Sequence, residues 1–190
     1  MSSIDFTRAE LAAAVFRGVR QCVVIGSPPS LREAFNDSPD KVLQVFAVDE
    51  EQPSDLLAAF VPTQFASEAL ATALEKSDFD KLKASLFVWL GAGYRTVDAV
   101  IASLAFIASL PGGSGVVFDY AAENTSVGSL THTALDALAS RILVAGGAVK
   151  HLIQPQAVAA MLRGLGFQKI VDLTQEELPV SGGHLVSAVV

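Results

Sequence analysis

The chain has 190 residues, of which 51% are hydrophobic and 17% charged, and its formal net charge at pH 7 is −7. This length suits one domain over residues 1–190, large enough to bury a full hydrophobic core. The acidic charge argues against a nucleic acid or an anionic membrane as partner, and no apolar run approaches the roughly 20 residues of a membrane span.

The beginning of the chain predicts a helix followed by a strand. Thr7 and Glu10 have the spacing of a capping box, so we expect a helix over residues 7–17 that is ended by Gly18. The apolar run at residues 21–25 then predicts the first central strand.

The only cysteine, Cys22, lies within this first strand. A single cysteine can form no internal disulfide, and the N-terminus lacks the basic and then apolar pattern of a signal peptide. We therefore expect a reducing, cytoplasmic setting. Inside a buried strand the thiol is expected to act as a small hydrophobic side chain rather than as a reactive group.

Helix and strand patterns continue to alternate along the rest of the chain. Further strands are expected at residues 42–48, 60–63, 85–89, 114–120, 167–173 and 184–190. Further helices are expected at residues 30–36, 53–59, 67–76, 97–107, 128–144 and 155–165. Such alternation predicts an α/β three-layer sandwich, in which helices cover both faces of a mostly parallel sheet. The last two strands follow each other without a helix between them, so we expect that pair to be antiparallel.

Gly26 directly follows the first strand, and Asp49 directly follows the second. In nucleoside-binding α/β sheets, a glycine turn at the first position receives the charged end of the ligand. An acidic residue at the second position receives the ribose hydroxyls. The loop after Gly26 continues with Ser27, Pro28 and Pro29, where such loops normally carry further glycines. The sequence therefore predicts the sheet more firmly than a working site.

Several short motifs occur in an order that is typical of one known family. They lie at residues 18–26, 45–49, 79–80, 86–88, 111–114, 118–120 and 165–167. Over residues 17–190, the chain resembles the leucine carboxyl methyltransferase-like family of S-adenosylmethionine-dependent O-methyltransferases. The resemblance implies a Rossmann-like class I methyltransferase sheet, mostly parallel with an antiparallel last strand. It also implies O-methyl transfer to a small molecule or a carboxylate.

The resemblance places the carboxylate of S-adenosylmethionine at the loop after the first strand. A carboxylate there is bound by backbone N–H donors at a helix N-terminus, and Pro28 and Pro29 remove two such donors. The remaining candidate ligands are Gly26, Ser27, the Ser30 hydroxyl and Arg32. The family has a second glycine and then Asp-Thr-Arg in this loop, and of that pattern only Gly26 and Arg32 are present.

Three further residues are candidates for the nucleoside end of the cofactor. Asp49 is placed to bind the ribose diol, or else it is a solvated acid at a strand end. Gln64 stands where the family has an acidic residue, and it either hydrogen-bonds the adenine amino group or lies at the surface. Trp89 stands where the family has a glutamate, and it either stacks on the base or fills the pocket.

Tyr94 and Arg95 follow the fourth strand, at the edge where substrates bind in open α/β sheets. They are candidate anion contacts of the substrate, or else ordinary exposed side chains at the start of a helix. His132, His151 and His184 are far apart in the sequence and lack the spacing of metal ligands, so we expect no metal site.

Two functions are compatible with these residues. The first is a methyltransferase that uses S-adenosylmethionine and a small-molecule substrate. The alternative is a catalytically inactive methyltransferase-fold protein that serves as a binding or assembly module. The missing glycines, the two prolines, Gln64 and Trp89 favour it. A nicotinamide-dependent oxidoreductase would need Gly-x-Gly-x-x-Gly after the first strand, and Gly26 stands alone. The high apolar content predicts that some hydrophobic surface is covered by a second copy of the chain, in a homodimer. As the acidic charge indicates, neither a nucleic acid nor a membrane is expected as partner.

Overall fold

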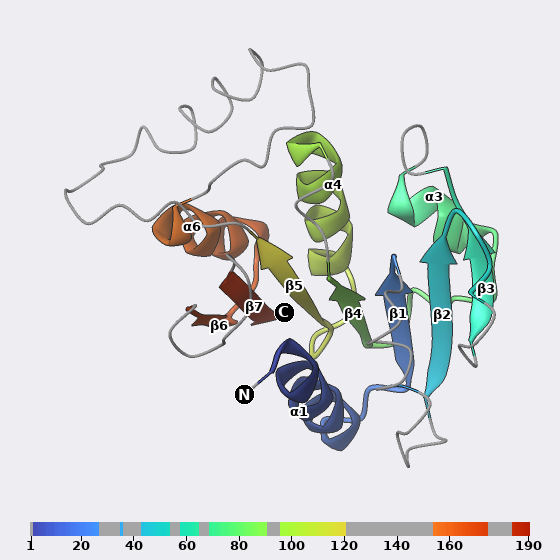
Figure 1. The fold of residues 1–190 in the computed structure, drawn as a ribbon, viewed down its shortest axis with the longest axis horizontal. Coiled ribbons are helices and arrows are strands. Elements are labelled where there is room, and N and C mark those ends of the chain that lie inside the picture. Colours follow the sequence, from blue (N-terminus) through green and yellow to red (C-terminus); the bar gives the residue numbers. More distant parts are fainter. Residues whose placement is uncertain are drawn as a thin grey trace.

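A seven-stranded sheet forms the centre of the molecule (Figure 1). The computed structural model describes residues 2–26, 35, 43–53, 58–64, 69–90, 96–120, 154–174 and 184–190. Its strands are β1 (Gln21–Ile25), β2 (Gln44–Asp49), β3 (Ala59–Pro62), β4 (Ser85–Trp89), β5 (Gly115–Tyr120), β6 (Lys169–Leu173) and β7 (His184–Val189). They lie in the order β3-β2-β1-β4-β5-β7-β6.

Strand directions confirm the predicted, mostly parallel sheet. From β3 across to β5 all neighbouring strands are parallel, whereas β7 pairs antiparallel with both β5 and β6. The carboxyl ends of β1 to β6 therefore share one edge of the sheet with the amino end of β7. Hereafter this is called the carboxyl edge.

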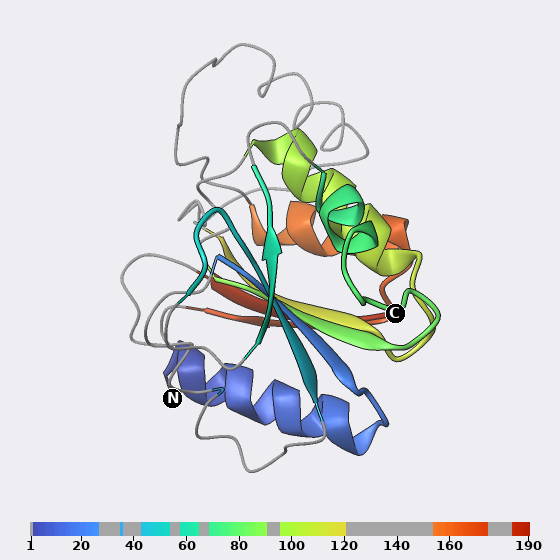
Figure 2. The ribbon, with the colours of Figure 1, turned by 90° about the vertical axis from the view of Figure 1, so that its right-hand side faces the viewer.

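Helices cover both faces of the sheet, which completes the three layers (Figure 2). The described helices are α1 (Ser3–Phe16), α3 (Leu70–Glu75), α4 (Val97–Ala108) and α6 (Pro155–Leu165). Apolar side chains of α1 pack on one face of the sheet, and those of α3, α4 and α6 pack on the other. None of the described helices has the length and apolar content needed to cross a membrane.

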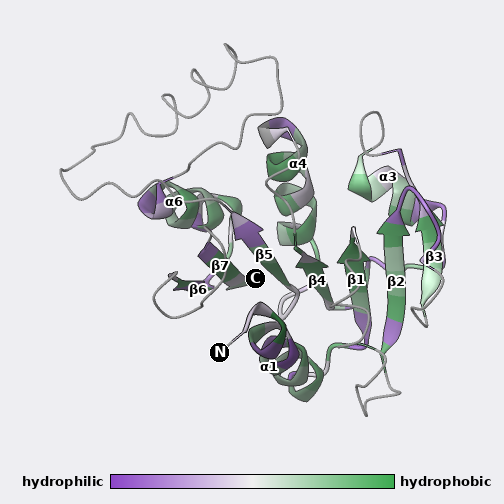
Figure 3. Ribbon diagram, in the orientation of Figure 1, coloured by the Kyte–Doolittle hydropathy of each residue, from purple (hydrophilic) through white to green (hydrophobic). Residues whose placement is uncertain are grey.

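The central strands β1 and β4 are buried along their whole length, as their uninterrupted apolar sequences predict. Figure 3 shows both as mostly hydrophobic. Side chains alternate between the faces: Val23 and Ile25 join the α3/α4/α6 layer, and Cys22 joins the α1 layer. Burial of Cys22 raises the pKa of its thiol well above the ordinary value, which keeps the sulfur protonated and confirms its role as a core residue.

Helix α6 has the bounds that the sequence predicts. A proline opens it, and Gly166 ends it in the left-handed conformation with φ 109°. Val158 and Leu162 are buried against the sheet. Helix α4 has the same kind of amphipathic pattern, with Leu104 and Ile107 fully buried.

Several predicted boundaries differ from those of the structure by one or more residues, and two of the differences have a clear local cause. Helix α1 begins at Ser3 rather than at Thr7, because Ser2 and Asp5 form the capping box there. The Thr7 hydroxyl is inside the helix and donates to the Ser3 carbonyl at 2.8 Å. Ala59 opens β3 instead of ending a helix.

Other expected helices are only partly tested. The helix expected over residues 67–76 is shorter, because α3 spans Leu70–Glu75. Most of the helix expected over residues 30–36 and all of the helix expected over residues 128–144 lie outside the described residues.

Candidate functional site

The carboxyl edge is where open α/β sheets bind ligands. Four predicted site residues lie in the described part of the chain, and all four follow or end strands at this edge: Gly26, Asp49, Gln64 and Trp89. The others lie outside the described residues: Ser27, Ser30, Arg32, Tyr94 and Arg95.

Gly26 follows β1 with φ 60°, a left-handed conformation that favours glycine. Its N–H donates to the Val48 carbonyl at 3.0 Å, so this donor is already used by the neighbouring strand. A Cβ built on Gly26 would meet no atom of the described residues within 4 Å. The glycine therefore contributes a turn and open space at the edge, whereas a ligand's carboxylate must find its N–H donors elsewhere.

Asp49 ends β2 beside this turn and is held there by backbone bonds. Its carbonyl accepts the Thr63 N–H at 3.0 Å, and its Oδ1 accepts the Glu50 N–H at 2.8 Å. An ionised carboxylate offers two oxygens that only accept hydrogen bonds, which is the chemistry that a vicinal diol requires. Asp49 thus lies where the sequence places a ribose ligand.

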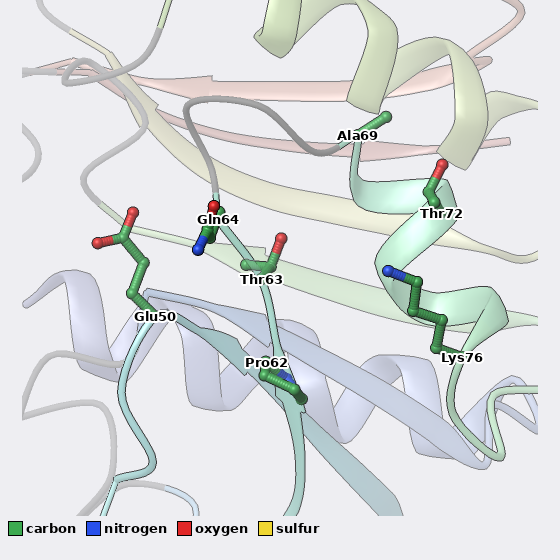
Figure 4. A pocket seen from close by; sticks show the side chains of 7 residues that line it. All are labelled: Glu50, Pro62, Thr63, Gln64, Ala69, Thr72 and Lys76. Atoms are coloured by element: carbon green, nitrogen blue, oxygen red, sulfur yellow. The ribbon is translucent and has the colours of Figure 1, made fainter.

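A hollow of about 780 Å³ opens beyond Asp49, between β3 and α3 (Figure 4). Its lining residues are Glu50, Pro62, Thr63, Gln64, Ala69, Thr72 and Lys76. Figure 4 shows Glu50 and Gln64 on one side and Thr72 and Lys76 on the other. The hollow therefore offers an anionic, an amide and a cationic group to a polar ligand.

The sequence prediction placed Gln64 at this site and missed Glu50. In the sequence, Glu50 is only a neighbour of Asp49 in an acidic run. Its position directly after the end of β2 is the signal that could have identified it. Lys76 and Thr72 carry no such signal, because only the packing of α3 beside β3 brings them to the hollow.

Trp89 ends β4 and is only 4% exposed. It belongs to the apolar cluster on the α3/α4/α6 face, together with Phe118 and Phe87. This burial favours the interpretation in which the indole fills space beneath the edge.

A second polar cluster lies at the same edge, where β5, β7 and β6 meet. The Tyr120 hydroxyl donates to Asp172 Oδ2 at 2.6 Å, and His184 Nδ1 lies 2.8 Å from Asp172 Oδ1. Tyr120 and His184 are cross-strand partners, with the hydroxyl 3.2 Å from Nδ1. Burial, and then the bond to Asp172, raise the pKa of the Tyr120 phenol well above its ordinary value, so the hydroxyl stays protonated.

Sequence reasoning missed this cluster because its members are 52 and 64 positions from Tyr120. Only the register of β5, β7 and β6 brings them together. Within the described residues, no group of three or more His, Cys, Asp or Glu side chains is arranged to hold a metal ion.

The strand order and the antiparallel β7 define the class I S-adenosylmethionine-dependent methyltransferase fold. Similar solved structures include a SAM-dependent methyltransferase from Archaeoglobus fulgidus, with 13% identity and a TM-score of 0.58 over 98% of this chain and 94% of that one. A DUF574 family protein from Streptomyces avermitilis has 14% identity and a TM-score of 0.60 over 98% of this chain and 80% of that one.

Magnesium protoporphyrin IX methyltransferase from Synechocystis, solved with SAH bound, has 13% identity and a TM-score of 0.54 over 98% of this chain and 81% of that one. These likenesses show the fold. The sequence itself matches no protein-family model and no curated protein.

Proposed function

We propose that this chain is an S-adenosylmethionine-dependent methyltransferase that acts on an oxygen of a small molecule, as a member of the leucine carboxyl methyltransferase-like family. One observation carries the proposal. In a class I methyltransferase sheet, Asp49 ends β2 and Gly26 follows the neighbouring β1, so both residues lie at the carboxyl edge, where the Gly26 N–H bonds to the Val48 carbonyl.

The described residues fit the nucleoside part of this cofactor. Asp49 would accept hydrogen bonds from the ribose hydroxyls, and Gln64 in the hollow would bind the adenine amino group through its amide oxygen. Gly26 leaves room for the ligand because it has no Cβ. When bound, S-adenosylmethionine supplies a methyl group on a positively charged sulfur, which takes back the electron pair as the methyl leaves.

The protein's own contribution is to position its ligands and to exclude water. The proposal assigns the cofactor carboxylate to Ser27, Ser30 and Arg32, and the substrate to Tyr94 and Arg95. It also includes a cytoplasmic homodimer with neither nucleic acid nor membrane as partner.

The alternative function, an inactive binding or assembly module, is favoured by two observations. Trp89 is only 4% exposed, and an indole that fills the pocket would exclude the cofactor. The Gly26 N–H is bonded to Val48, so the loop that would hold the cofactor carboxylate has one donor fewer than the sequence suggests. Pro28 and Pro29 remove two more.

Calorimetric titration with S-adenosylmethionine and S-adenosylhomocysteine separates the two functions. For the methyltransferase we expect micromolar binding that Asp49→Ala weakens at least about tenfold, the loss of one good charged hydrogen bond. The matched control is Asp78→Ala, since Asp78 is an exposed acid in the turn before β4 at the opposite edge. If neither heat nor a rise in melting temperature occurs at saturating ligand, the chain is the inactive module.

A further inference from the structure

The cluster of Tyr120, Asp172 and His184 lies on the edge that the proposed cofactor uses. Tyr120 is the last residue of β5, and His184 is the first residue of the antiparallel β7. Strand β7 is three places from β1 in the sheet, which is about 14 Å at the usual strand spacing. A base acts only on a proton within hydrogen-bond reach, so the acceptor's reacting hydroxyl has to lie at the β5 and β7 end of this edge, with the cofactor extending toward it from β1.

The hydrogen bonds determine where the protons of the cluster are. An ionised Asp172 only accepts, so its Oδ2 takes the Tyr120 proton and its Oδ1 takes a proton from His184 Nδ1. With the proton on Nδ1, a neutral imidazole carries its lone pair on Nε2. This is the same arrangement by which a carboxylate orients the histidine of a hydrolase triad.

Nε2 of His184 is the atom that remains available. Both hydrogen bonds of His184 within the described part of the chain use Nδ1, and its side chain is 12% exposed. No buried side-chain nitrogen or oxygen among the described residues lacks a partner, so Nε2 reaches solvent at the edge.

We propose that His184 Nε2 takes the proton of the acceptor's hydroxyl group, and that Asp172 and Tyr120 are positioning residues that hold the ring and its tautomer. This inference rests on the proposed methyltransferase function. The acceptor's O–H bond breaks and an N–H bond forms on Nε2, while the oxygen keeps the electron pair with which it bonds the incoming methyl carbon. Asp172 stabilises the resulting imidazolium, which then releases its proton to water.

The proposal narrows the substrate class. A carboxylate acceptor is already ionised at neutral pH and needs no base, whereas an alcohol or phenol must lose a proton during transfer. His184 therefore points to a hydroxylated small molecule rather than to a carboxylic acid.

The first measurement is made without an acceptor. In protein labelled with ¹⁵N-histidine, nitrogen chemical shifts at neutral pH should show His184 with the proton on Nδ1 and a bare Nε2. Diethyl pyrocarbonate, which acylates unprotonated imidazole nitrogen, should modify His184 in the folded protein, as followed by peptide mass spectrometry.

Asp172→Asn replaces the acceptor with an amide whose N–H can donate to Nδ1, which moves the ring proton to Nε2. We expect this variant to invert the nitrogen shifts and to slow the acylation at least about tenfold. Tyr120→Phe, which keeps the ring and removes only one donor to Asp172, should retain the wild-type tautomer. The matched control is Asp119→Asn, because Asp119 pairs with Leu185 and its side chain points to the opposite face of the sheet.

The outcomes distinguish this inference from the proposed function. A wild-type His184 that is protonated on Nε2, or that does not react, overturns the inference even when S-adenosylhomocysteine binds. Absence of S-adenosylhomocysteine binding overturns the proposed function and the acceptor role with it, whatever the tautomer. A bare, reactive Nε2 together with S-adenosylhomocysteine binding supports both.

Discussion

Gln21 and Asp80 are 59 positions apart in the sequence and are hydrogen-bonded to each other at the edge of the sheet opposite to the candidate site. The Gln21 amide donates to the Asp80 carbonyl at 2.9 Å, and the Asp80 N–H donates to Gln21 Oε1 at 2.9 Å. The same amide nitrogen also donates to the Ser85 hydroxyl at 3.0 Å. One buried side chain thus fixes the start of β1 against the turn that leads into β4.

Replacing the Gln21 amide by an apolar group of the same size should lower the stability of the fold. Gln21→Leu keeps the volume but removes the buried bond to Ser85 and leaves the partly buried carbonyl and N–H of Asp80 without this partner, so we expect the free energy of unfolding to fall by about 1–3 kcal/mol. The control is Gln44→Leu, since Gln44 is the exposed neighbour of Gln21 in the register of β1 and β2. Urea denaturation measures both, and equal effects would show that the amide bonds contribute nothing specific.

The capping box of α1 predicts a dependence of stability on pH. The Ser2 backbone N–H and hydroxyl donate to the Asp5 carboxylate at 2.9 and 2.7 Å. These bonds, the backbone one foremost, hold the pKa of Asp5 below its ordinary value of 3.8. The ionised acid therefore stabilises the fold above that ordinary value, and this contribution disappears as the pH falls through the lowered pKa.

Asp5→Asn should accordingly melt at a lower temperature than wild type at neutral pH, and the two curves should converge in strong acid. Ser2→Ala removes the hydroxyl that both donates to Asp5 and accepts its N–H. Because Ser2 and Asp5 bond to each other, the double variant should lose less stability than the sum of the losses in the two single variants. Parallel melting curves at every pH, or full additivity, would contradict the coupling.

The sequence predicts the sheet well because burial imposes patterns that are local. The bounds of β1 and β4 follow from short apolar runs, and those of α6 follow from a proline at one end and Gly166 at the other. The start of α1 was missed because Thr7 and Ser2 both stand three residues before an acid. The helix continues back to Ser2, since no helix-breaking residue separates the two candidates.

The site is predicted less completely because its parts come from distant strands. Asp49 was proposed from the end of its strand and Gln64 from the family resemblance, and the structure has both after or at strand ends on the carboxyl edge. His184 was taken for an isolated residue, since its distance from Asp172 depends on the register of two antiparallel strands. No local pattern sets that register, and the open Nε2 follows only from the hydrogen bonds that it creates.

The predicted homodimer can be tested at two exposed hydrophobic side chains. Phe16 at the end of α1 is 94% exposed, and Leu82 in the turn before β4 is 81% exposed. Covering one such side chain contributes about 1.5–3 kcal/mol, so a second copy of the chain would gain by burying them. Light scattering should give twice the chain mass of 19.9 kDa for wild type and a lower mass for Phe16→Ser.

Arg17→Ser is the matched control for that measurement, because Arg17 is the exposed polar neighbour of Phe16. It should leave the mass unchanged. A monomeric mass for the wild-type protein at working concentration would rule out the homodimer, and an unchanged dimer in Phe16→Ser would place the interface elsewhere.

A methyl group added at Gly26 should lower the affinity for the proposed cofactor without preventing the protein from folding. Because φ is 60° there, Gly26→Ala costs about 1–2 kcal/mol of backbone strain, but the new Cβ meets no atom within 4 Å in the described part of the chain. It projects instead into the open space at the carboxyl edge. We therefore expect a weaker affinity for S-adenosylhomocysteine, measured by calorimetry at a temperature where the variant is fully folded.

Gly166→Ala separates the two effects, since Gly166 also has a positive φ, 109°, and also has nothing within 4 Å of an added Cβ. It lies at the end of α6, far along the chain from the turn after β1, so it should destabilise the fold and leave the affinity unchanged. If both alanine variants bound equally well, the space above Gly26 would not be the cofactor's, and the site would have to be sought nearer the hollow between β3 and α3.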